Sequence, residues 1–405
     1  MRPDLVAWLR ESALPLWAGS GFDRRTGLFH EALDRDARPI DGAARRLMVQ
    51  ARQIHVFALA EIRGWYPGGE CAERAAQEML ACFMDQGGGG GFAFSVDADG
   101  AVRDSGRDLY AQAFALFALA WMARLTGRSF YLDIADATLN FLDTRMALPE
   151  TGGYRESLPE GGGGRRQNPH MHLVEALLAL HEACPDRGYA GRAGQLIGLM
   201  ERRFLQGAGR VLVEFYDERL VPLQTPPYAF EPGHHFEWAW LLTEHARLTA
   251  RPVPTLARHL YQVAEATVAL DGSIPDLTDE EGNVRAGTTR LWPHTEALRA
   301  AMLAWTPRCA TGRAHWRENV IALLFARFLG PAHQGCWIDR TDEEGHPLSL
   351  TVPASSLYHL VGAACRLAQF DRVGRDQGDA ARASQSRWLR PESLLPGLRL
   401  DGGPA

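Results

Sequence analysis

The chain contains no lysine, so all 43 of its basic residues are arginine. This absence excludes catalysis through a lysine Schiff base and any phosphate-binding loop that depends on a lysine. The net charge of −6 at pH 7 argues against a nucleic-acid-binding surface. No glycine-rich stretch has the flanking residues of a phosphate site, and no basic cluster begins a helix. We therefore expect neither a nucleotide cofactor nor a nucleic-acid partner.

Cysteine is scarce, and long hydrophobic runs are lacking. The six cysteines have no C-x-x-C spacing, which predicts reduced thiols in a cytoplasmic protein rather than a disulfide framework. They are Cys71, Cys82, Cys184, Cys309, Cys336 and Cys365. No apolar run approaches the ~18 residues of a membrane span, and residues 1–17 read as an amphipathic helix rather than a signal peptide. The sequence therefore predicts no membrane segment.

Helical periodicity dominates the rest of the chain. We expect helices near 3–17, 43–63, 70–85, 107–126, 129–146, 169–184, 188–206, 233–249, 253–269, 289–305, 311–329 and 355–370. Short and long connections alternate between them. Links such as 126–128 and 250–252 are short, whereas 148–168 and 205–232 are long and rich in Gly, Pro and Asp.

The alternation of short and long connections predicts the architecture. Short links make antiparallel helix pairs, and all the long loops leave from the same end. We therefore expect an all-α fold, an (α/α)6 barrel in which six helical hairpins close into a toroid. Short β pieces, such as 91–96 and 211–216, are expected in the long loops at one mouth. An open solenoid of hairpins is the alternative. Residues 1–375 are expected to form one catalytic domain, and 376–405 a C-terminal tail.

One segment, EPGHHFEW at 231–238, has the features of a reactive helix start. Pro232 suits the first turn of a helix, where its missing N–H costs nothing. His234 and Glu237 lie three residues apart and so share one helix face. An imidazole beside a carboxylate suits proton transfer, so we expect Glu237 to tune His234.

A polar or aromatic group recurs once in every helix pair. The positions are Arg52, Tyr110, His172, His234, His294 and His359, and the steps between them are 58, 62, 62, 60 and 65 residues. Six similar units give such a near-constant step, which places one group per unit on a common rim. Histidines, glutamates and aromatics around one cup indicate a neutral polyol ligand.

The expected sugar contacts divide into two kinds. The stacking candidates are Trp292, Trp337 and Tyr110, and the hydroxyl-binding candidates are Asn168, Arg52 and Glu237. The neighbouring histidines His170, His235 and His294 are expected to support loops rather than to catalyse. Loop arginines Arg155, Arg165 and Arg166 would reach the cup if the sugar carried a sulfonate or phosphate group.

Three other classes of site compete with a proton-transfer site. A metal centre built on His234, Glu237 and His172 is the first, but there is no His-Glu-x-x-His motif, and acid/base chemistry explains the set without a metal. A glycoside hydrolase needs two carboxylates across a cleft, for which Glu237 and Glu296 are the candidates. A carbohydrate-binding toroid without activity would not need three histidines.

Several motifs together resemble the N-acylglucosamine 2-epimerase superfamily. They are QARQ at 50–53, NPHMHLVEA at 168–176, EPGHHFEW at 231–238, LWP at 291–293 and PASSLYHL at 353–360. The resemblance runs from about Trp17 to Leu367 and implies an (α/α)6 barrel. The last motif is similar to the aldose–ketose isomerase branch, which includes mannose isomerases. Two motifs depart from the usual pattern, Tyr-Ala-Gln at 110–112 and Trp-Pro-His at 292–294, and these bear on which hydroxyls are recognised.

The resemblance also implies roles for individual residues. Proton transfer falls to His234 and His359, with His172 as a third active-site histidine. Sugar binding falls to Arg52, Tyr110, Asn168, Glu237 and Trp292, with no metal and no cofactor. The implied reaction interconverts D-mannose and D-fructose, so the partner is a free monosaccharide. The alternatives are a sugar 2-epimerase and an isomerase of D-lyxose or sulfoquinovose, and the oligomeric state stays open.

Mechanistically, the two reactions differ in the number of bases that they need. An isomerase opens the sugar ring, removes the C2 proton and passes through a cis-enediolate, using one base on one face. A 2-epimerase needs bases on opposite faces. We expect His359 to be the C2/C1 base, His234 its acid/base partner, and the Arg52 cation to stabilise the enediolate oxygen.

Overall fold

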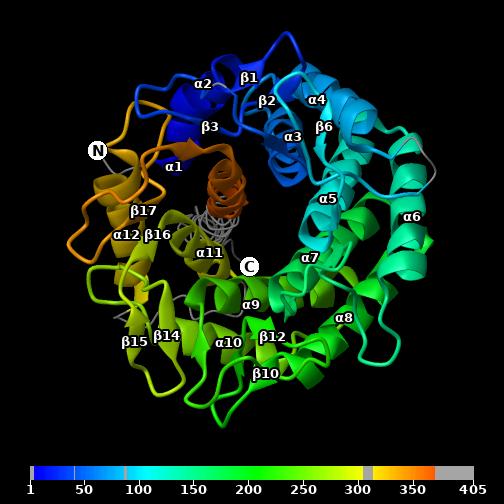
Figure 1. Cartoon of the computed structure of the whole chain (residues 1–405). Helices are drawn as coiled ribbons and strands as arrows, with labels where there is room; N and C mark the ends of the chain where they lie inside the picture. The colour runs from blue at the N-terminus through cyan, green and yellow to red at the C-terminus, as the bar shows by residue number, and fades with distance from the viewer. Residues whose placement is uncertain (1–3, 41, 86–88, 304–312, 370–405) are drawn as a thin grey trace, which may run out of the picture.

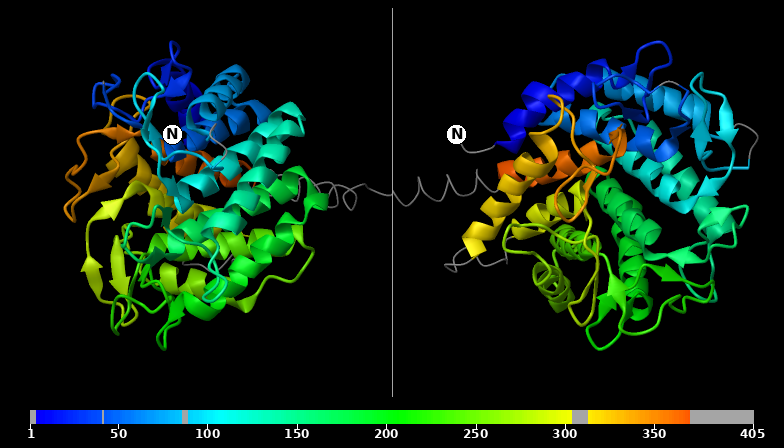
Figure 2. Two further views of the ribbon diagram at one scale, coloured as in Figure 1. Left: turned by 45° about the vertical axis from the view of Figure 1, so that its right-hand side comes forward. Right: turned by 60° about the vertical axis from the view of Figure 1, so that its left-hand side comes forward.

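The computed structural model describes residues 4–40, 42–85, 89–303 and 313–369, and their helices form two concentric rings (Figure 1). The all-α (α/α)6 barrel that the sequence predicts is confirmed. The proposed tail at 376–405 lies outside the described residues. Figure 2 shows the short strands gathered at one end of the barrel, as expected from the long loops.

The inner ring consists of the helices that follow the long loops. They are α3 (Leu47–Ile62), α5 (Leu109–Thr126), α7 (Gln167–Ala183), α9 (Pro232–Leu248), α11 (Leu291–Ala301) and the helix at 357–369, which the short helix η5 (Ala354–Ser356) precedes. From α3 to α11 each packs on the next. These helices are buried almost all round, which explains why apolar residues dominate their full circumference.

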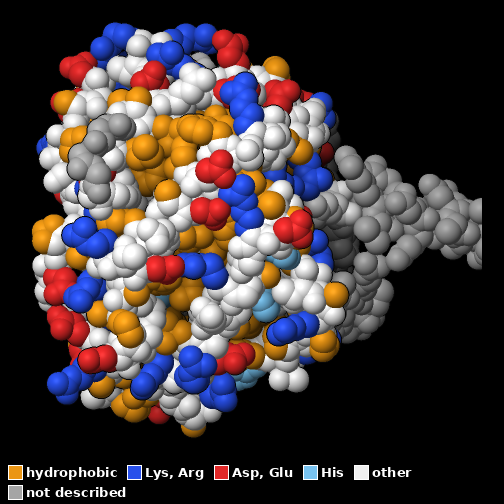
Figure 3. Space-filling view, turned by 90° about the vertical axis from the view of Figure 1, so that its right-hand side faces the viewer, with side chains coloured by type: hydrophobic (Ala, Val, Ile, Leu, Met, Phe, Trp, Pro, Cys, Tyr) orange, Lys and Arg blue, Asp and Glu red, His pale blue; other side chains and the backbone are white. Residues whose placement is uncertain are grey.

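The outer ring covers them with amphipathic helices. It consists of α1 (Leu5–Trp8) continuing through η1 (Leu9–Ala13) into α2 (Leu14–Gly19), α4 (Gly69–Phe83), α6 (Phe130–Phe141) with η2 (Leu142–Met146), η3 (Pro185–Arg187) with α8 (Tyr189–Arg203), α10 (Thr255–Glu265), and α12 (Arg313–Leu323) with η4 (Leu324–Leu329). On the face over α6, charged side chains of both signs alternate with apolar ones (Figure 3).

A two-residue strand precedes each inner helix and pairs, antiparallel, with a strand in the next long loop around the ring. These pairs are β4 (Arg45–Arg46) with β5 (Ser95–Val96), β7 (Arg107–Asp108) with β8 (Ser157–Leu158), β9 (Arg165–Arg166) with β12 (Phe215–Tyr216), β13 (Ala229–Phe230) with β14 (Leu277–Asp279), β16 (Thr289–Arg290) with β17 (Arg340–Thr341), and β18 (Val352–Pro353) with β3 (Ala32–Leu33). The remaining strands are β1 (Phe22–Asp23), β2 (Leu28–Phe29), β6 (Val102–Asp104), β10 (Leu205–Gln206), β11 (Val211–Leu212) and β15 (Val284–Ala286).

The ring is closed rather than open. The sixth strand pair joins β18 near the end of the chain to β3 near its beginning. Beside it, the Gln53 Nε2 group donates to the carbonyl of Ala354 at 2.7 Å, and Arg52 donates to the carbonyl of Ser355 at 3.2 Å. These bonds connect α3 to the start of the last helix. In an open solenoid the first and last helix pairs would not contact each other, so the toroid is the correct alternative.

One side chain near the start of each of five inner helices holds the neighbouring loop. Gln50 exchanges two hydrogen bonds with the backbone of Phe29, and Gln112 does the same with Phe92. Histidines occupy the next three positions, where Nδ1 donates to a backbone carbonyl and Nε2 accepts from a backbone N–H; they are His170, His235 and His294. Burial lowers the pKa of His170 and His235 to about 3. Their predicted loop-supporting role is confirmed.

The cysteines and the apolar helix α5 bear on two of the expectations drawn from composition. The five described cysteines are free, and Cys309 lies outside the described residues. The expectation that no apolar run reaches membrane-span length was wrong for α5, whose 18 residues have a mean hydropathy of 1.3. The window is 78% buried inside the barrel, because α5 packs between α3 and α7. Its apolar character is therefore that of a core helix.

Candidate active site

A cavity of about 250 Å³ opens among the first turns of the inner helices. Its lining combines three histidines with hydroxyl, amide, carboxyl and guanidinium groups: Arg52, Tyr110, Asn168, His172, Glu231, His234, Glu237, Arg290, Trp292, Asp339, Ser355, Ser356 and His359. Eight of the nine site residues predicted from the sequence meet here. Five of the six groups in the repeat therefore meet at a common focus, as their spacing indicated, but His294 does not line the cavity because both of its ring nitrogens bond to backbone atoms.

The ninth predicted residue, Trp337, lies elsewhere. Its side chain is 1% exposed and stacks on Trp17, with 5.2 Å between the ring centroids. It belongs to the core between the first outer helix and the loop after η4, so it does not line the cavity. An aromatic residue in a Gly- and Pro-rich loop carries no sequence signal that separates a sugar platform from a core contact.

Each cavity histidine has Nδ1 directed at a buried glutamate. The Nδ1–carboxylate distances are 3.1 Å for His172 and Glu175, 2.9 Å for His234 and Glu214, and 2.8 Å for His359 and Glu296. A carboxylate at Nδ1 keeps the proton on that nitrogen and leaves the lone pair on Nε2. Each ring therefore offers the opposite nitrogen, Nε2, for proton transfer at the cavity.

The predicted pairing of His234 with Glu237 was wrong. The carboxylates beside His234 are Glu214 and, at 3.9 Å, Glu231. Glu237 instead lies 3.8 Å from the Nδ1 atom of His172 on α7. Residues three apart on a helix point in similar directions, but α9 crosses α7 closely enough for the longer glutamate side chain to approach that neighbour. Glu214 comes from the loop between β11 and β12, which helix periodicity does not place.

The environments of the histidines push their pKa values in opposite directions. Burial alone would lower the pKa of His234, but the charges of Glu214 and Glu231 outweigh it and raise the pKa above its ordinary value. Burial dominates at His359 and lowers its pKa, and it lowers that of His172 to about 4. Near neutrality His234 is thus suited to donate a proton, while His359 is suited to accept one.

Arg52 provides the cation of the cavity. Its Nη2 group donates to the Tyr110 hydroxyl at 2.6 Å, and its guanidinium lies 4.2 Å from the centre of the Phe114 ring and 4.9 Å from that of Tyr358. Aromatic faces replace water around this charge. No carboxylate among the described residues forms an ion pair with Arg52, so the charge is free to meet a developing oxyanion.

Trp292 forms an aromatic wall of the cavity between His234 and His359. Its ring centroid lies 5.0 Å from that of His234 and 5.6 Å from that of His359. The side chain is only partly buried, as a sugar-stacking platform must be. Gly233 allows this position, because a Cβ atom on it would lie 2.5 Å from the indole ring.

The close approach at Gly233 gives a first prediction. Gly233→Ala forces Trp292 to shift, and we expect KM for the sugar to rise about tenfold, the equivalent of one lost aromatic contact of ~1.4 kcal/mol. Steady-state kinetics measure this. The matched control is Gly194→Ala on α8, where the nearest atom is 3.5 Å away. The control should leave KM unchanged, and equal kinetics for the two variants would contradict the packing argument.

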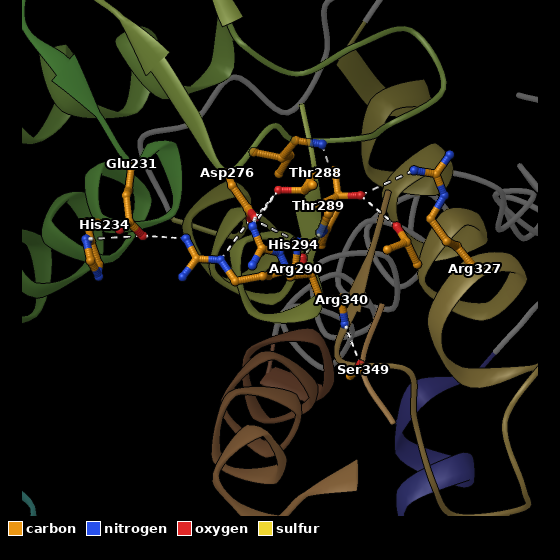
Figure 4. Close-up of polar contacts among 12 residues, drawn as sticks. Glu231, His234, Asp276, Thr288, Thr289, Arg290, His294, Arg327, Arg340 and Ser349 are labelled. Atoms are coloured by element: carbon orange, nitrogen blue, oxygen red, sulfur yellow. Dashed lines mark hydrogen bonds and ion pairs between the residues drawn. The ribbon is translucent and has the colours of Figure 1, made fainter. Parts of the chain in front are cut away.

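A series of ion pairs at the rim of the cavity was not predicted from the sequence. Arg290 donates through Nη2 to Glu231 at 2.6 Å and through Nε to Asp276 at 2.8 Å. Figure 4 shows Glu231 between His234 and Arg290, and Asp276 on the far side of the guanidinium. Because Asp276 lies in the loop before β14, only the folded chain connects it to His234. Asp339, Ser355 and Ser356 are further lining residues without an earlier assignment.

Comparison with known proteins now identifies the fold and chemistry. A model of the N-acylglucosamine 2-epimerase family matches residues 27–363. The chain belongs to this family. A protein of Rhizobium meliloti (strain 1021) named mannose-6-phosphate isomerase is 34% identical over 381 residues, which are 89% of this chain and 95% of that protein. Family membership makes this protein a sugar isomerase or epimerase.

Two further relatives represent both reactions. A D-mannose isomerase of Thermobifida fusca is 28% identical over 258 residues, which are 60% of this chain and 62% of that protein. The structure of a cellobiose 2-epimerase from Bacillus thermoamylovorans B4167 has a TM-score of 0.81 and 20% identity, covering 91% of this chain and 98% of that one. The latter shows the shared fold alone.

Of the three clusters of potential metal ligands among the described residues, two lie at the cavity. One is His172, Glu175 and Glu237, and the other is Glu214, Glu231 and His234. Three of their four carboxylates already have partners: Glu175 accepts from the Tyr358 hydroxyl and from Arg299, Glu231 accepts from Arg290, and Glu214 accepts from Gln167, whereas Glu237 has no hydrogen-bond partner. The contacts of the three partnered carboxylates fit a role in supporting the histidines. The expectation of a site without a metal remains a prediction, to be tested by chelation.

The glycosidase pair and the loop arginines do not meet at the cavity. Glu296 is fully buried behind His359, so Glu237 and Glu296 do not face each other across a cleft. The loop arginines line a different groove of about 680 Å³ beside the long loops. Arg165 is buried there against the carbonyl of Gly152, and Arg155 pairs with Glu160.

Glu237 is the unusual carboxyl of this active site. Both of its oxygens are buried without a hydrogen-bond partner. Burial, together with the charges of Glu296 and Glu175, raises its pKa well above the ordinary value. The raised pKa favours the protonated carboxyl, which carries a donor that Asp or Glu usually lacks.

A protonated Glu237 gives a second prediction. Glu237→Gln replaces a neutral acid by a neutral amide of the same size, so the free energy of unfolding should change by less than about 1 kcal/mol and kcat by less than about tenfold. Chemical denaturation and steady-state kinetics measure the two quantities. Glu296→Gln is the comparison, because it removes an ionised carboxylate and should be far more damaging. Equal losses in both variants would show that Glu237 is ionised.

Proposed function

We propose that this family member is an aldose–ketose isomerase that interconverts D-mannose and D-fructose without a metal. The observation that carries the proposal is the pairing of an acid-prone His234 with a base-prone His359 on the two sides of Trp292. The named D-mannose isomerase relative and the motif at 353–360 support the isomerase over the epimerase.

Ring opening comes first, because an aldose is mostly a closed hemiacetal. A base must take the anomeric hydroxyl proton while an acid protonates the ring oxygen. His234, held protonated by Glu214 and Glu231, supplies the acid, and a neutral histidine on the opposite wall supplies the base. The C1–ring oxygen bond then breaks and leaves a free aldehyde.

Proton transfer between C2 and C1 follows. His359 removes the C2 proton, now acidic beside the carbonyl, and the electron pair moves to form the cis-enediolate. Arg52, without a carboxylate partner, stabilises the oxygen that becomes negative. Return of the proton from His359 to C1, with transfer of the C2 hydroxyl proton to the negative oxygen on C1, gives the ketose. One base on one face completes the reaction.

The size and charge of the cavity favour a neutral monosaccharide. A volume of about 250 Å³ lies below the ~300–1,000 Å³ usual for drug-sized ligands. Of its two arginines, Arg290 is already neutralised by Glu231 and Asp276. Arg52 alone is left for the enediolate, so the cavity lining has no spare cation for the phosphate of a sugar such as mannose 6-phosphate.

Proton NMR of the EDTA-treated protein with D-mannose in D2O tests the proposal. We expect fructose, with deuterium entering at C1 or the C2 hydrogen carried over to it. Glucose alone would instead require a base on each sugar face and would assign the protein to the 2-epimerases. Loss of turnover on chelation, restored by a divalent metal, would contradict metal-free chemistry. Parallel assays with mannose 6-phosphate, D-lyxose and a sulfonated hexose separate the substrates.

A further inference from the structure

A layer of buried charged side chains lies behind the active-site cavity, and Arg299 of α11 is at its centre. Its Nη1 group donates to Glu296 and its Nη2 group to Glu175, both at 3.2 Å. Glu296 holds His359, and Glu175 holds His172. A single guanidinium therefore joins two histidine–carboxylate pairs that three different helices contribute.

The charge of Arg299 divides three neighbouring glutamates into two kinds. Burial alone would raise the pKa of Glu175 and Glu296, but hydrogen bonds from the histidines and the charge of Arg299 outweigh it and lower both. Glu237 has no such hydrogen bond, and its pKa is raised. The surroundings thus favour the ionised form of the two carboxylates that orient histidines and the neutral form of the third.

Groups from five inner helices interact with this arginine. They are His55 of α3, Glu175 of α7, Glu237 and Trp240 of α9, Glu296 of α11, and Tyr358 and Arg366 of the helix at 357–369. The Tyr358 hydroxyl also donates to Glu175, so that carboxylate has donors from three side chains. Removing Arg299 would leave Glu175 and Glu296 without the guanidinium that both contact.

We propose that Arg299 is a positioning residue that keeps Glu175 and Glu296 ionised and in place, so that His172 and His359 both present Nε2 to the sugar. This inference rests on the proposed function, because it assigns proton transfer to His359. Arginine is required, since its planar fork reaches two carboxylates at once, whereas a lysine ammonium reaches one. The Trp240 ring, 3.5 Å from the guanidinium carbon, fixes the plane of the fork.

The structure offers an unusual way to test this role. Among the described residues, the C-terminal ends of the inner helices enclose a second cavity of about 320 Å³, and both Arg299 and Glu175 line it. It lies at the end of the barrel opposite the sugar site. A small cation added to the solution has a route through this cavity to the place of the arginine head group without entering the sugar site.

Arg299→Ala with chemical rescue is the experiment. We expect kcat to fall about 10–100-fold, the usual cost of losing a group that orients a functional histidine, while KM changes less than about twofold. Millimolar guanidinium should restore kcat along a saturating curve. Urea, a neutral molecule of the same shape, and sodium chloride at equal ionic strength should not. Unchanged kcat in the variant would overturn the proposal, and so would equal rescue by urea.

The matched control is Arg247→Ala. Arg247 lines the same cavity and pairs with Glu182 and Glu244, but contacts neither histidine pair. We expect this variant to keep the parental kcat and pH profile and to ignore guanidinium. Activation of the control by guanidinium would show that the cation acts at the cavity in general and would overturn the assignment to Arg299.

A second measurement does not depend on folding of the alanine variant or on the substrate. In 15N-histidine NMR of the unliganded protein, His172 and His359 should show protonated Nδ1 and bare Nε2. Arg299→Lys keeps the buried charge but loses one of the two links, so at least one of these signals should change its tautomer or titration midpoint. Unchanged histidine signals would refute the positioning role. If the signal changes in the variant but the parental protein does not turn over mannose, the positioning role stands and the proposed substrate is refuted.

Discussion

Replacing His359 by glutamine should lower kcat for mannose–fructose interconversion by about 10³-fold, with little change in KM. Glutamine keeps a hydrogen-bond donor near Glu296 but has no nitrogen that can take a proton from C2. Positioned acid/base groups contribute about 10²–10⁴-fold, and this base acts directly on carbon. The variant keeps Arg52, Asn168 and Trp292, the proposed sugar contacts, so binding of the ground state should survive.

Two further observations make the His359 result decisive. Deuterium exchange at C2 in D2O should fall in parallel with turnover, because both need removal of the same proton. His346→Gln is the control, since its exposed ring pairs with Asp342 and is not part of the cavity lining. The control should retain full activity. Exchange that persists in the His359 variant would transfer the base role to another histidine.

Replacing Glu214 by glutamine should remove activity mainly on the alkaline side. Glu214 is the nearer of the two carboxylates that raise the pKa of His234, against the burial that lowers it. Without that charge, burial dominates, the pKa of His234 falls, and the proton needed for ring opening is lost at a lower pH. We expect kcat at about pH 8 to fall ~10²-fold, in line with the loss of a carboxylate that orients a catalytic histidine.

The sign of the pH dependence follows from the two shifts. His359 must be neutral, and its lowered pKa places the acidic limb of the profile below the ordinary histidine value of ~6.5. His234 must be protonated, and its raised pKa places the alkaline limb above that value. Glu214→Gln should move only the alkaline limb, toward lower pH. A full pH–rate profile checks this, and a shift of the acidic limb alone would reverse the assignment of acid and base.

A variant of Gln167 is the control for Glu214→Gln. The Gln167 side chain donates to the second oxygen of Glu214 at 2.9 Å and accepts from the Trp238 indole at 2.8 Å, so any change at Glu214 also disturbs this bond. Gln167→Leu removes the contact to Glu214 but leaves the charge of the Glu214 carboxylate in place. It should reduce stability and leave the alkaline limb in place. An equal limb shift in both variants would show that packing, rather than the carboxylate charge, governs His234.

The repeat in the sequence determined the fold and most of the cavity. Six units of near-equal length, each with a polar residue at a helix start, place those residues on one rim once the helices are arranged as hairpins. Arg52, Tyr110, His172, His234 and His359 therefore meet where their spacing indicated. The same logic found the loop-supporting histidines, because they occupy an equivalent position in successive units.

Only the tertiary structure decided which groups work together. Glu214 and His234 are 20 residues apart, Glu296 and His359 are 63 apart, and Glu175 and Arg299 are 124 apart, so no local pattern pairs them. Closure of the ring brings these side chains into hydrogen-bond distance, and burial then fixes their charges. A sequence shows spacing along the chain, whereas proton affinity depends on the charges and desolvation around each group in space.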